Sequence, residues 1–225
     1  MSDLWIFGDS FSAPYTNFEL GSWASQYIKW KGYTPKTFGE NLSDRLGINV
    51  NNFSLGGSDN YTIFDLLMDN APNFKKGDIV IVGWSDIVRF RLANQEDIFK
   101  FILPNMDNSK LIMGVTQNSI NEILVNRTND AYFEEFKTRF NFLNWALKDY
   151  TLIQWTPFIA NLDTIKYYNP FVKEITKNIR LETNGEVNDT HFSEIGHIEM
   201  ADHFMSLIND QEARKKNNNI LSRIF

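Results

Sequence analysis

Two segments far apart in the sequence hold residue types that could together perform nucleophilic chemistry. The first reads Gly8-Asp9-Ser10, and the second, near the end of the chain, reads Asp189-Thr190-His191. A serine hydroxyl becomes a nucleophile when a histidine accepts its proton, and the histidine needs an acceptor that orients its ring. In an extended segment, side chains at positions i and i+2 point the same way, which would let Asp189 hold the ring of His191. From these residues alone, an ordinary loop role for both remains the alternative.

The choice of a base is narrow, because the chain has only three histidines. His197 and His203 are six residues apart, which is about 600° of rotation on a helix, so they do not share a face. We expect His197 to be a packing or capping residue at a helix start, which leaves His191 as the candidate base. A rival nucleophile is Ser85, but the pattern Gly-x-Ser-x-Gly fails there because Ile87 occupies the place of the second glycine.

The elements that must position these residues alternate between strands and helices. Continuous apolar runs indicate strands that are buried on both faces. We predict five strands, at residues 4–7, 50–55, 78–84, 111–115 and 151–155. We predict amphipathic helices over residues 35–46, with Thr34 as N-cap, and over 63–68, 95–103, 130–148 and 193–208. This alternation predicts βαβ units and a single three-layer αβα sandwich with a mostly parallel sheet of about five strands.

In such a sheet, ligands bind beyond the carboxyl ends of the strands. Ser10 follows the first predicted strand, Gly57 follows the second and Ser85 follows the third. Residues 11–33 hold seven aromatic side chains and come directly after Ser10. A stretch of this length between elements is either functional or locally structured. We therefore expect a local aromatic core there, with a lid or substrate contact over the nucleophile as the alternative.

Three sequence blocks resemble those of the SGNH (GDSL) hydrolase superfamily. Phe7-Gly8-Asp9-Ser10-Phe11-Ser12 resembles the first block, residues 52–63 resemble the second, and residues 189–197 resemble the last. The blocks occur in the family order and span residues 4–205. The resemblance implies the flavodoxin-like SGNH fold, with Ser10 as nucleophile and Asp189 and His191 as its catalytic partners. It also implies an oxyanion hole from the backbone N–H groups of Ser10 and Gly57, with Ser85 or a neighbour as a further donor, and no cofactor. No cluster of His, Asp and Glu has the spacing of a metal site.

Two positions depart from the family pattern. Ser85 stands where the family has an oxyanion-hole asparagine, and loss of one such donor can cost about 10²- to 10³-fold in rate. The arrangement of Trp84-Ser85 and Arg89 resembles phage-encoded members of the superfamily. The commoner pattern places the acid three residues before the histidine, where this chain has Asn188. An asparagine there can cost about 10⁴-fold. We predict Asp189 as the third member, with Asn188 as the fallback.

Composition excludes several other classes of protein. The chain has 225 residues, and its 22 Lys and Arg against 28 Asp and Glu leave a net charge of −6, which disfavours binding to nucleic acid or to an anionic membrane. The absence of cysteine excludes disulfides, thiolate metal sites and a cysteine nucleophile. No apolar stretch approaches the ~20 residues that span a bilayer, and no basic leader precedes the first strand. We expect synthesis in the cytoplasm, a hydrolase-like domain over residues 1–210 and a polar tail over 211–225.

The candidate residues and the resemblance to SGNH hydrolases together predict a serine ester hydrolase that removes a small acyl group, such as acetate, from a carbohydrate. The substrate is expected to be a small acyl ester or an acylated glycan. Esterase, thioesterase and transferase activities remain open at this point, as do the acyl group and the alcohol. The alternative is a binding or structural module of the same fold that is catalytically weak or inactive. Such a module could form homo-oligomers or serve as a virion component.

Overall fold

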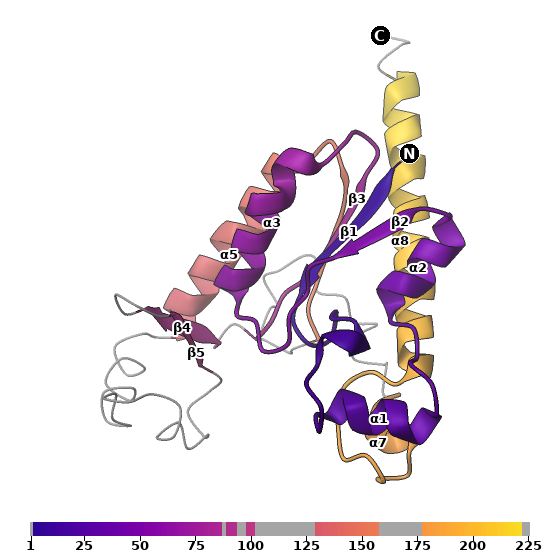
Figure 1. Ribbon diagram of the computed structural model, residues 1–225. Helices are drawn as coiled ribbons and strands as arrows, with labels where there is room; N and C mark the ends of the chain where they lie inside the picture. The colour runs from indigo at the N-terminus through magenta and orange to yellow at the C-terminus, as the bar shows by residue number, and fades with distance from the viewer. Residues whose placement is uncertain (1, 87–88, 94–97, 102–128, 158–176, 222–225) are drawn as a thin grey trace.

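The computed structural model describes residues 2–86, 89–93, 98–101, 129–157 and 177–221 (Figure 1). Four parallel strands form the main sheet, in the order β2-β1-β3-β6. Their bounds are Asp3–Gly8 (β1), Asn49–Asn52 (β2), Ile79–Gly83 (β3) and Thr151–Trp155 (β6). The described sheet thus has four strands and not about five, and the strand predicted at 111–115 lies outside the described residues.

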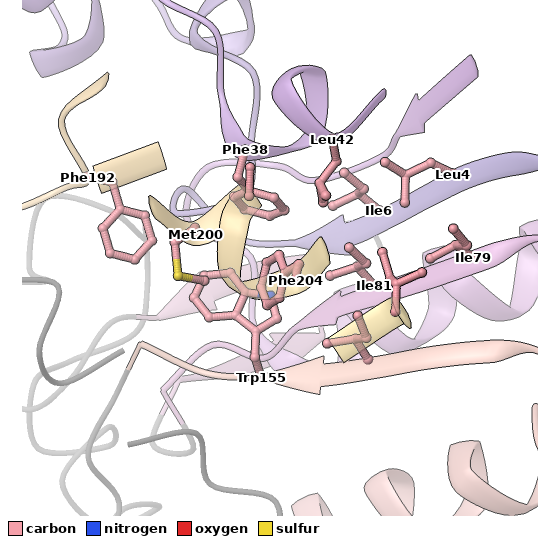
Figure 2. Close-up of a cluster of buried hydrophobic side chains, with 13 residues drawn as sticks. Leu4, Ile6, Phe38, Leu42, Ile79, Ile81, Trp155, Phe192, Met200 and Phe204 are labelled. Carbon is pink, nitrogen blue, oxygen red and sulfur yellow. The ribbon is translucent and has the colours of Figure 1, made fainter. Parts of the chain in front are cut away.

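Helices cover both faces of this sheet, which makes the three layers (Figure 1). On one face lie α2 (Phe38–Leu46) and α8 (Glu194–Leu221), and on the other lie α3 (Asn60–Asn70) and α5 (Asn129–Ala146). The strands supply alternate side chains to the two faces, as the pleat requires. One core holds Leu4, Ile6, Ile79, Ile81, Phe38, Leu42, Met200 and Phe204 (Figure 2). The other holds Trp5, Phe7, Val80, Val82, Ile63, Leu67, Phe140 and Leu143. The predicted αβα sandwich is therefore confirmed.

The register brings the carboxyl ends of the two central strands side by side. Gly8 at the end of β1 is paired with Gly83 at the end of β3. A Cβ atom on either glycine would lie 2.5 Å from the hydroxyl oxygen of Ser12, so a side chain at either position would collide with it. The two glycines therefore let the chain that follows β1 turn closely across the strand ends, and this turn carries Ser10.

The segment after β3 differs from the prediction. We predicted a helix over 95–103, and this is wrong because Ile98–Phe101 forms strand β5, antiparallel to β4 (Phe90–Ala93). Isoleucine and phenylalanine favour strands when a partner strand is available, and the partner overrides the weak helical pattern. The loop after β1 contains local structure that the sequence left open, namely η1 (Tyr15–Asn17) and α1 (Trp23–Lys31).

Helix boundaries also shift from those predicted. The N-cap of α2 is Thr37 and not Thr34, because the carboxylate of Glu40 accepts hydrogen bonds from Thr37 in a capping box. Helix α8 continues to Leu221, through most of the residues predicted as a tail. Short helices complete the described chain at Ala71–Asn73 (η2) and Ile179–Glu182 (α7). Within the described ranges, no helix combines the length and apolar character needed to cross a membrane.

Candidate active site

Ser10 lies on a tight turn directly after β1. The backbone carbonyl of Asp9 accepts hydrogen bonds from the N–H groups of Ser12 and Ala13, both at 3.0 Å. The Asp9 carboxylate accepts a third from the N–H of Phe11, also at 3.0 Å. Asp9 therefore closes the turn with both its backbone and its side chain, as short acidic residues do in turns. Ser10 is held at the carboxyl edge of the sheet with 9% of its surface exposed.

The residue pair Asp189 and His191 lies in the loop between α7 and α8. The first turn of α7 fixes the loop backbone. The N–H of Ile179 donates to the backbone carbonyl of His191 at 3.0 Å, and the N–H of Arg180 donates to the backbone carbonyl of Asp189 at 2.9 Å. An antiparallel bridge joins Asn178 to Phe192. A short helix thus fixes the extended segment in which positions i and i+2 point the same way.

The structure brings the three predicted residues into one hydrogen-bonded chain. Nε2 of His191 lies 2.7 Å from the hydroxyl oxygen of Ser10, and Nδ1 lies 2.6 Å from Oδ1 of Asp189. The same carboxylate oxygen accepts the backbone N–H of His191 at 2.8 Å. Asn188, the fallback, is exposed. With the Asp189 carboxylate at Nδ1, that nitrogen carries the proton, and the free pair on Nε2 accepts the Ser10 hydroxyl hydrogen.

Gly57 lies in a turn that is tied to the end of β1. The N–H of Leu55 donates to the carbonyl of Gly8 at 3.0 Å. Within the turn, the N–H of Ser58 donates to the carbonyl of Leu55 at 3.3 Å. Gly57 is the third residue of this turn and has a φ of 74°, the left-handed value that a type II turn requires there. The side-chain amide of Asn52 donates to the carbonyl of Ser12 at 2.8 Å. These contacts hold the Gly57 turn beside the turn that carries Ser10.

Ser85 follows β3 as predicted, but its hydroxyl is engaged elsewhere. Its Oγ donates to Oδ2 of Asp9 at 3.0 Å, and its side chain is buried. The backbone of Ser85 is held by Asn60, whose side chain accepts the Ser85 N–H at 2.8 Å and donates to the Ser85 carbonyl at 3.1 Å. Sequence reasoning missed this role of Asn60. Its only signal was a place in the second block, directly after the helix N-cap Asp59.

A buried ion pair lies behind the Ser10 turn. Burial raises the pKa of the Asp9 carboxyl, while the Arg89 guanidinium, the Phe11 N–H and the Ser85 hydroxyl oppose this rise. The Nη1 atom of Arg89 is 3.2 Å from Oδ2 of Asp9, and it also donates to the carbonyl of Ser58 at 3.4 Å. Arg89 therefore joins the Ser10 turn to the Gly57 turn and compensates a carboxylate that is almost wholly buried.

His197 is placed as a capping residue. Its Nδ1 atom accepts the N–H of Phe38, the first residue of α2, at 3.3 Å. Burial, with a smaller contribution from the nearby His191, lowers the pKa of His197 to about 3. The ring is therefore neutral at ordinary pH and takes no part in the hydrogen-bonded chain at Ser10. In the part of the chain that the structure describes, no group of His, Cys, Asp or Glu side chains is arranged to hold a metal ion.

Two aromatic side chains from the loop after β1 lie on the imidazole of His191. The ring of Trp23 is stacked on it with centroids 4.0 Å apart, and the ring of Phe11 is stacked with centroids 4.4 Å apart. Sequence reasoning left residues 11–33 open between a local core and contacts over the nucleophile. Part of the segment also forms a small core, in which Tyr15 and Tyr27 are buried with Ile179 of α7.

Comparisons with known proteins give distant structural matches. No family model matches the chain. No curated protein matches it. Two solved structures match it at low identity, and both cover 92% of this chain with TM-scores of 0.41. One, from Desulfitobacterium hafniense DCB-2, is described as a lipolytic protein of the G-D-S-L family, is 12% identical and is covered over 99% of its length. The other, from Parabacteroides merdae ATCC 43184, is described as a GDSL-like lipase, is 11% identical and is covered over 95%.

Both descriptions name the family that the three sequence blocks resemble. At this TM-score the likeness assigns no residue a role. The case for a function therefore rests on the geometry around Ser10.

Proposed function

We propose that this protein is a serine ester hydrolase of the SGNH type, with Ser10 as nucleophile, His191 as general base and Asp189 as the acceptor that orients the base. One observation carries the proposal. The distances of 2.7 Å from Ser10 to His191 and 2.6 Å from His191 to Asp189 are those of a nucleophile, a base and an orienting group in hydrogen-bond contact.

In the proposed reaction, Oγ of Ser10 forms a bond to the acyl carbon while its proton moves to Nε2 of His191. The carbonyl electron pair moves to the oxygen, and the backbone N–H groups of Ser10 and Gly57 donate to this oxyanion. When the intermediate collapses, the ester C–O bond breaks and the alcohol leaves with the proton from His191. Water then attacks the acyl carbon while His191 takes a proton from it. The second tetrahedral intermediate collapses, the bond from the acyl carbon to Oγ breaks, the carboxylic acid is released and His191 returns the proton to Ser10.

A small acyl group, such as acetate on a carbohydrate, is the substrate we propose. The rings of Phe11 and Trp23 stand against His191, and Phe18 lies over the turn beside Gly57, since a Cβ on Gly56 would be 2.9 Å from the Phe18 ring. Bulky side chains this close to His191 and to the Gly57 turn favour a short acyl chain. A carbohydrate is the alcohol we propose because aromatic side chains near a site suit the apolar faces of a sugar.

The test is labelling of the purified protein with a fluorophosphonate, read by intact mass and peptide mapping. We expect one adduct per chain, on Ser10, and none in Ser10→Ala. Ser85→Ala is the matched control and should still be labelled, because the Ser85 hydroxyl is buried and donates to the Asp9 carboxylate, not to His191. An adduct on Ser85 in the wild-type protein would refute the assignment of the nucleophile. A positive result is followed by a comparison of acetyl, butyryl and octanoyl esters and of acetylated sugars.

The second candidate is a catalytically weak binding or structural module with the same fold. The observation that favours it is the Ser85 hydroxyl, which donates to Asp9 and so does not replace the amide of the family asparagine. A folded wild-type protein that takes no fluorophosphonate adduct and binds a glycan array would support this candidate. The molar mass of the protein in solution would then show whether the module forms homo-oligomers, as a virion component could.

A further inference from the structure

The imidazole of His191 is contacted in its plane and on its two faces. In its plane, Nδ1 contacts Asp189 and Nε2 contacts Ser10. Above and below the plane are two aromatic rings, Trp23 at 4.0 Å with an interplanar angle of 7° and Phe11 at 4.4 Å with an angle of 29°. Two rings at these distances cannot share one face of a five-membered ring without overlapping, so they lie on opposite faces.

Each of these rings is itself held by neighbours. Phe11 follows Ser10 directly, and its ring packs edge-on against Phe192, with centroids 5.4 Å apart. Trp23 is the first residue of α1 and packs against Phe18 at 4.8 Å and Tyr15 at 5.8 Å. Packed side chains therefore restrict two motions of the imidazole, which are rotation about its bond to Cβ and tilting out of its plane.

Trp23 is not needed by the core of the sandwich. It is half-buried, and its neighbours belong to the loop after β1 and the His191 loop, not to the two clusters that cover the sheet. Trp23 packs against the small cluster around Tyr15 and Tyr27, and its ring lies parallel to that of His191.

We propose that Trp23 and Phe11 are positioning residues that hold His191 between them and stabilise the imidazolium that forms when Ser10 gives up its proton. The π faces of aromatic rings carry negative potential, so a cation stacked between two of them is favoured over the neutral ring. This inference rests on the proposed function, because the imidazolium forms only if His191 acts as a base.

The test compares Trp23→Leu with Trp23→Phe. Leucine keeps apolar bulk but removes the π face, and phenylalanine restores a face. We expect Trp23→Leu to lower the rate constant for fluorophosphonate labelling, and kcat for an acetyl ester, by about 10- to 30-fold with little change in KM. Trp23→Phe should recover the rate to within about threefold of wild type. A merely structural role for Trp23 would not distinguish the two variants in this way.

The matched control is Trp30→Leu, the same change on the same helix. Trp30 is 39% exposed and stacks on Tyr27, away from His191. This variant should label at the wild-type rate, and thermal unfolding of all three variants shows whether they fold. Equal labelling rates in folded Trp23→Leu and wild type would overturn the inference, as would an equal loss in Trp30→Leu.

A spectroscopic measurement separates failure of the inference from failure of the proposed function. Ring currents from two stacked aromatics should move the carbon-bound ring protons of His191 upfield in an NMR spectrum of the histidine side chains, and Trp23→Leu should reverse much of this shift. If the shift is present but the wild-type protein takes no adduct, the enclosure exists and the hydrolase proposal fails. If the adduct forms and the shift is absent, the hydrolase stands and the enclosure is refuted.

Discussion

Asp189 and Asn188 are adjacent residues with opposite surroundings. Asp189 contacts both Nδ1 and the backbone N–H of His191, whereas Asn188 is exposed. If His191 takes a proton from Ser10, only a carboxylate both orients the ring and stabilises its charge. We therefore predict that Asp189→Asn lowers kcat for an acetyl ester by about 10⁴-fold, as such replacements do in serine hydrolases.

Asn188→Ala is the control for this prediction. Its side chain faces solvent, so we expect kcat to stay within about twofold of wild type, as for other exposed substitutions. Initial rates with p-nitrophenyl acetate give both values. A loss in Asn188→Ala as large as that in Asp189→Asn would mean that the loop rearranges and that the acid was assigned to the wrong residue.

Which parts of the site the sequence could predict follows from how each contact is made. Ser10 and His191 are 181 residues apart, and only their places in recognisable blocks brought them together before the structure did. The donation from Ser85 to Asp9 and the stacking of Trp23 on His191 left no trace in the sequence, because they depend on side-chain directions that tertiary packing sets. Residue types predict a chemistry, but they do not predict that the Ser85 hydroxyl is bonded to Asp9 and so is not available as an oxyanion-hole donor.

At the level of elements, Lys31 joins the loop after β1 to the loop that carries His191. It lies at the end of α1, and its Nζ is 2.9 Å from Glu182 of α7 and 2.6 Å from Glu194 at the start of α8. Tyr27 adds a hydrogen bond of 2.7 Å to Glu182 and accepts the Glu194 N–H at 2.9 Å. All three charged side chains are at most 23% exposed, so removal of Lys31 leaves two carboxylates without a compensating positive charge.

We predict that Lys31→Met lowers the free energy of unfolding by about 2 kcal/mol, below the range for fully buried pairs because this cluster is partly solvated. Since α1 also carries Trp23, labelling of Ser10 should slow as well. Lys36→Met provides the control, because its ion pair with Asp44 is more than half exposed on both sides and should cost at most about 1 kcal/mol. Urea unfolding measures both variants, and similar losses in the two would contradict a special role for Lys31.

The strands and helices themselves were predictable to different degrees. Buried strands such as Ile79–Gly83 are predictable because they are continuous apolar runs. The helix Asn129–Ala146 is predictable because its buried apolar residues, such as Phe136, Phe140 and Leu143, recur at helical spacing. The segment Ile98–Phe101 has residues that suit either state, and its strand exists only because Phe90–Ala93 pairs with it. Helix α1 has few apolar residues on one face, and its packing against η1 and α7 makes it a helix. The local sequence pattern does not predict secondary structure where contacts with a distant segment determine it.

At the scale of the whole molecule, stability is linked to pH through groups whose titration differs between the folded and unfolded chain. His197 has a pKa of about 3 when folded, against an ordinary value of 6.5, chiefly because it is buried. Between these values the unfolded chain binds a proton that the folded chain does not, so stability falls as the pH falls. Asp78 acts at lower pH: burial raises the pKa of its carboxyl, but hydrogen bonds from Lys75, Asp3 and Trp5 outweigh this and lower it.

We predict that the free energy of unfolding is constant well above pH 6.5 and has fallen by about 2 kcal/mol at pH 5 from His197 alone. In His197→Asn this part of the slope should disappear, because an amide oxygen can still accept the Phe38 N–H but does not titrate. His203→Asn is the control, since partial burial lowers the pKa of that histidine as well, and it should change the slope less. Urea unfolding between pH 5 and 8 measures all three proteins. An unchanged slope in His197→Asn would show that the ring is not held neutral at the start of α2. The acid sensitivity would then have to arise from carboxylates such as Asp78, and it would begin nearer pH 4 than pH 6.5.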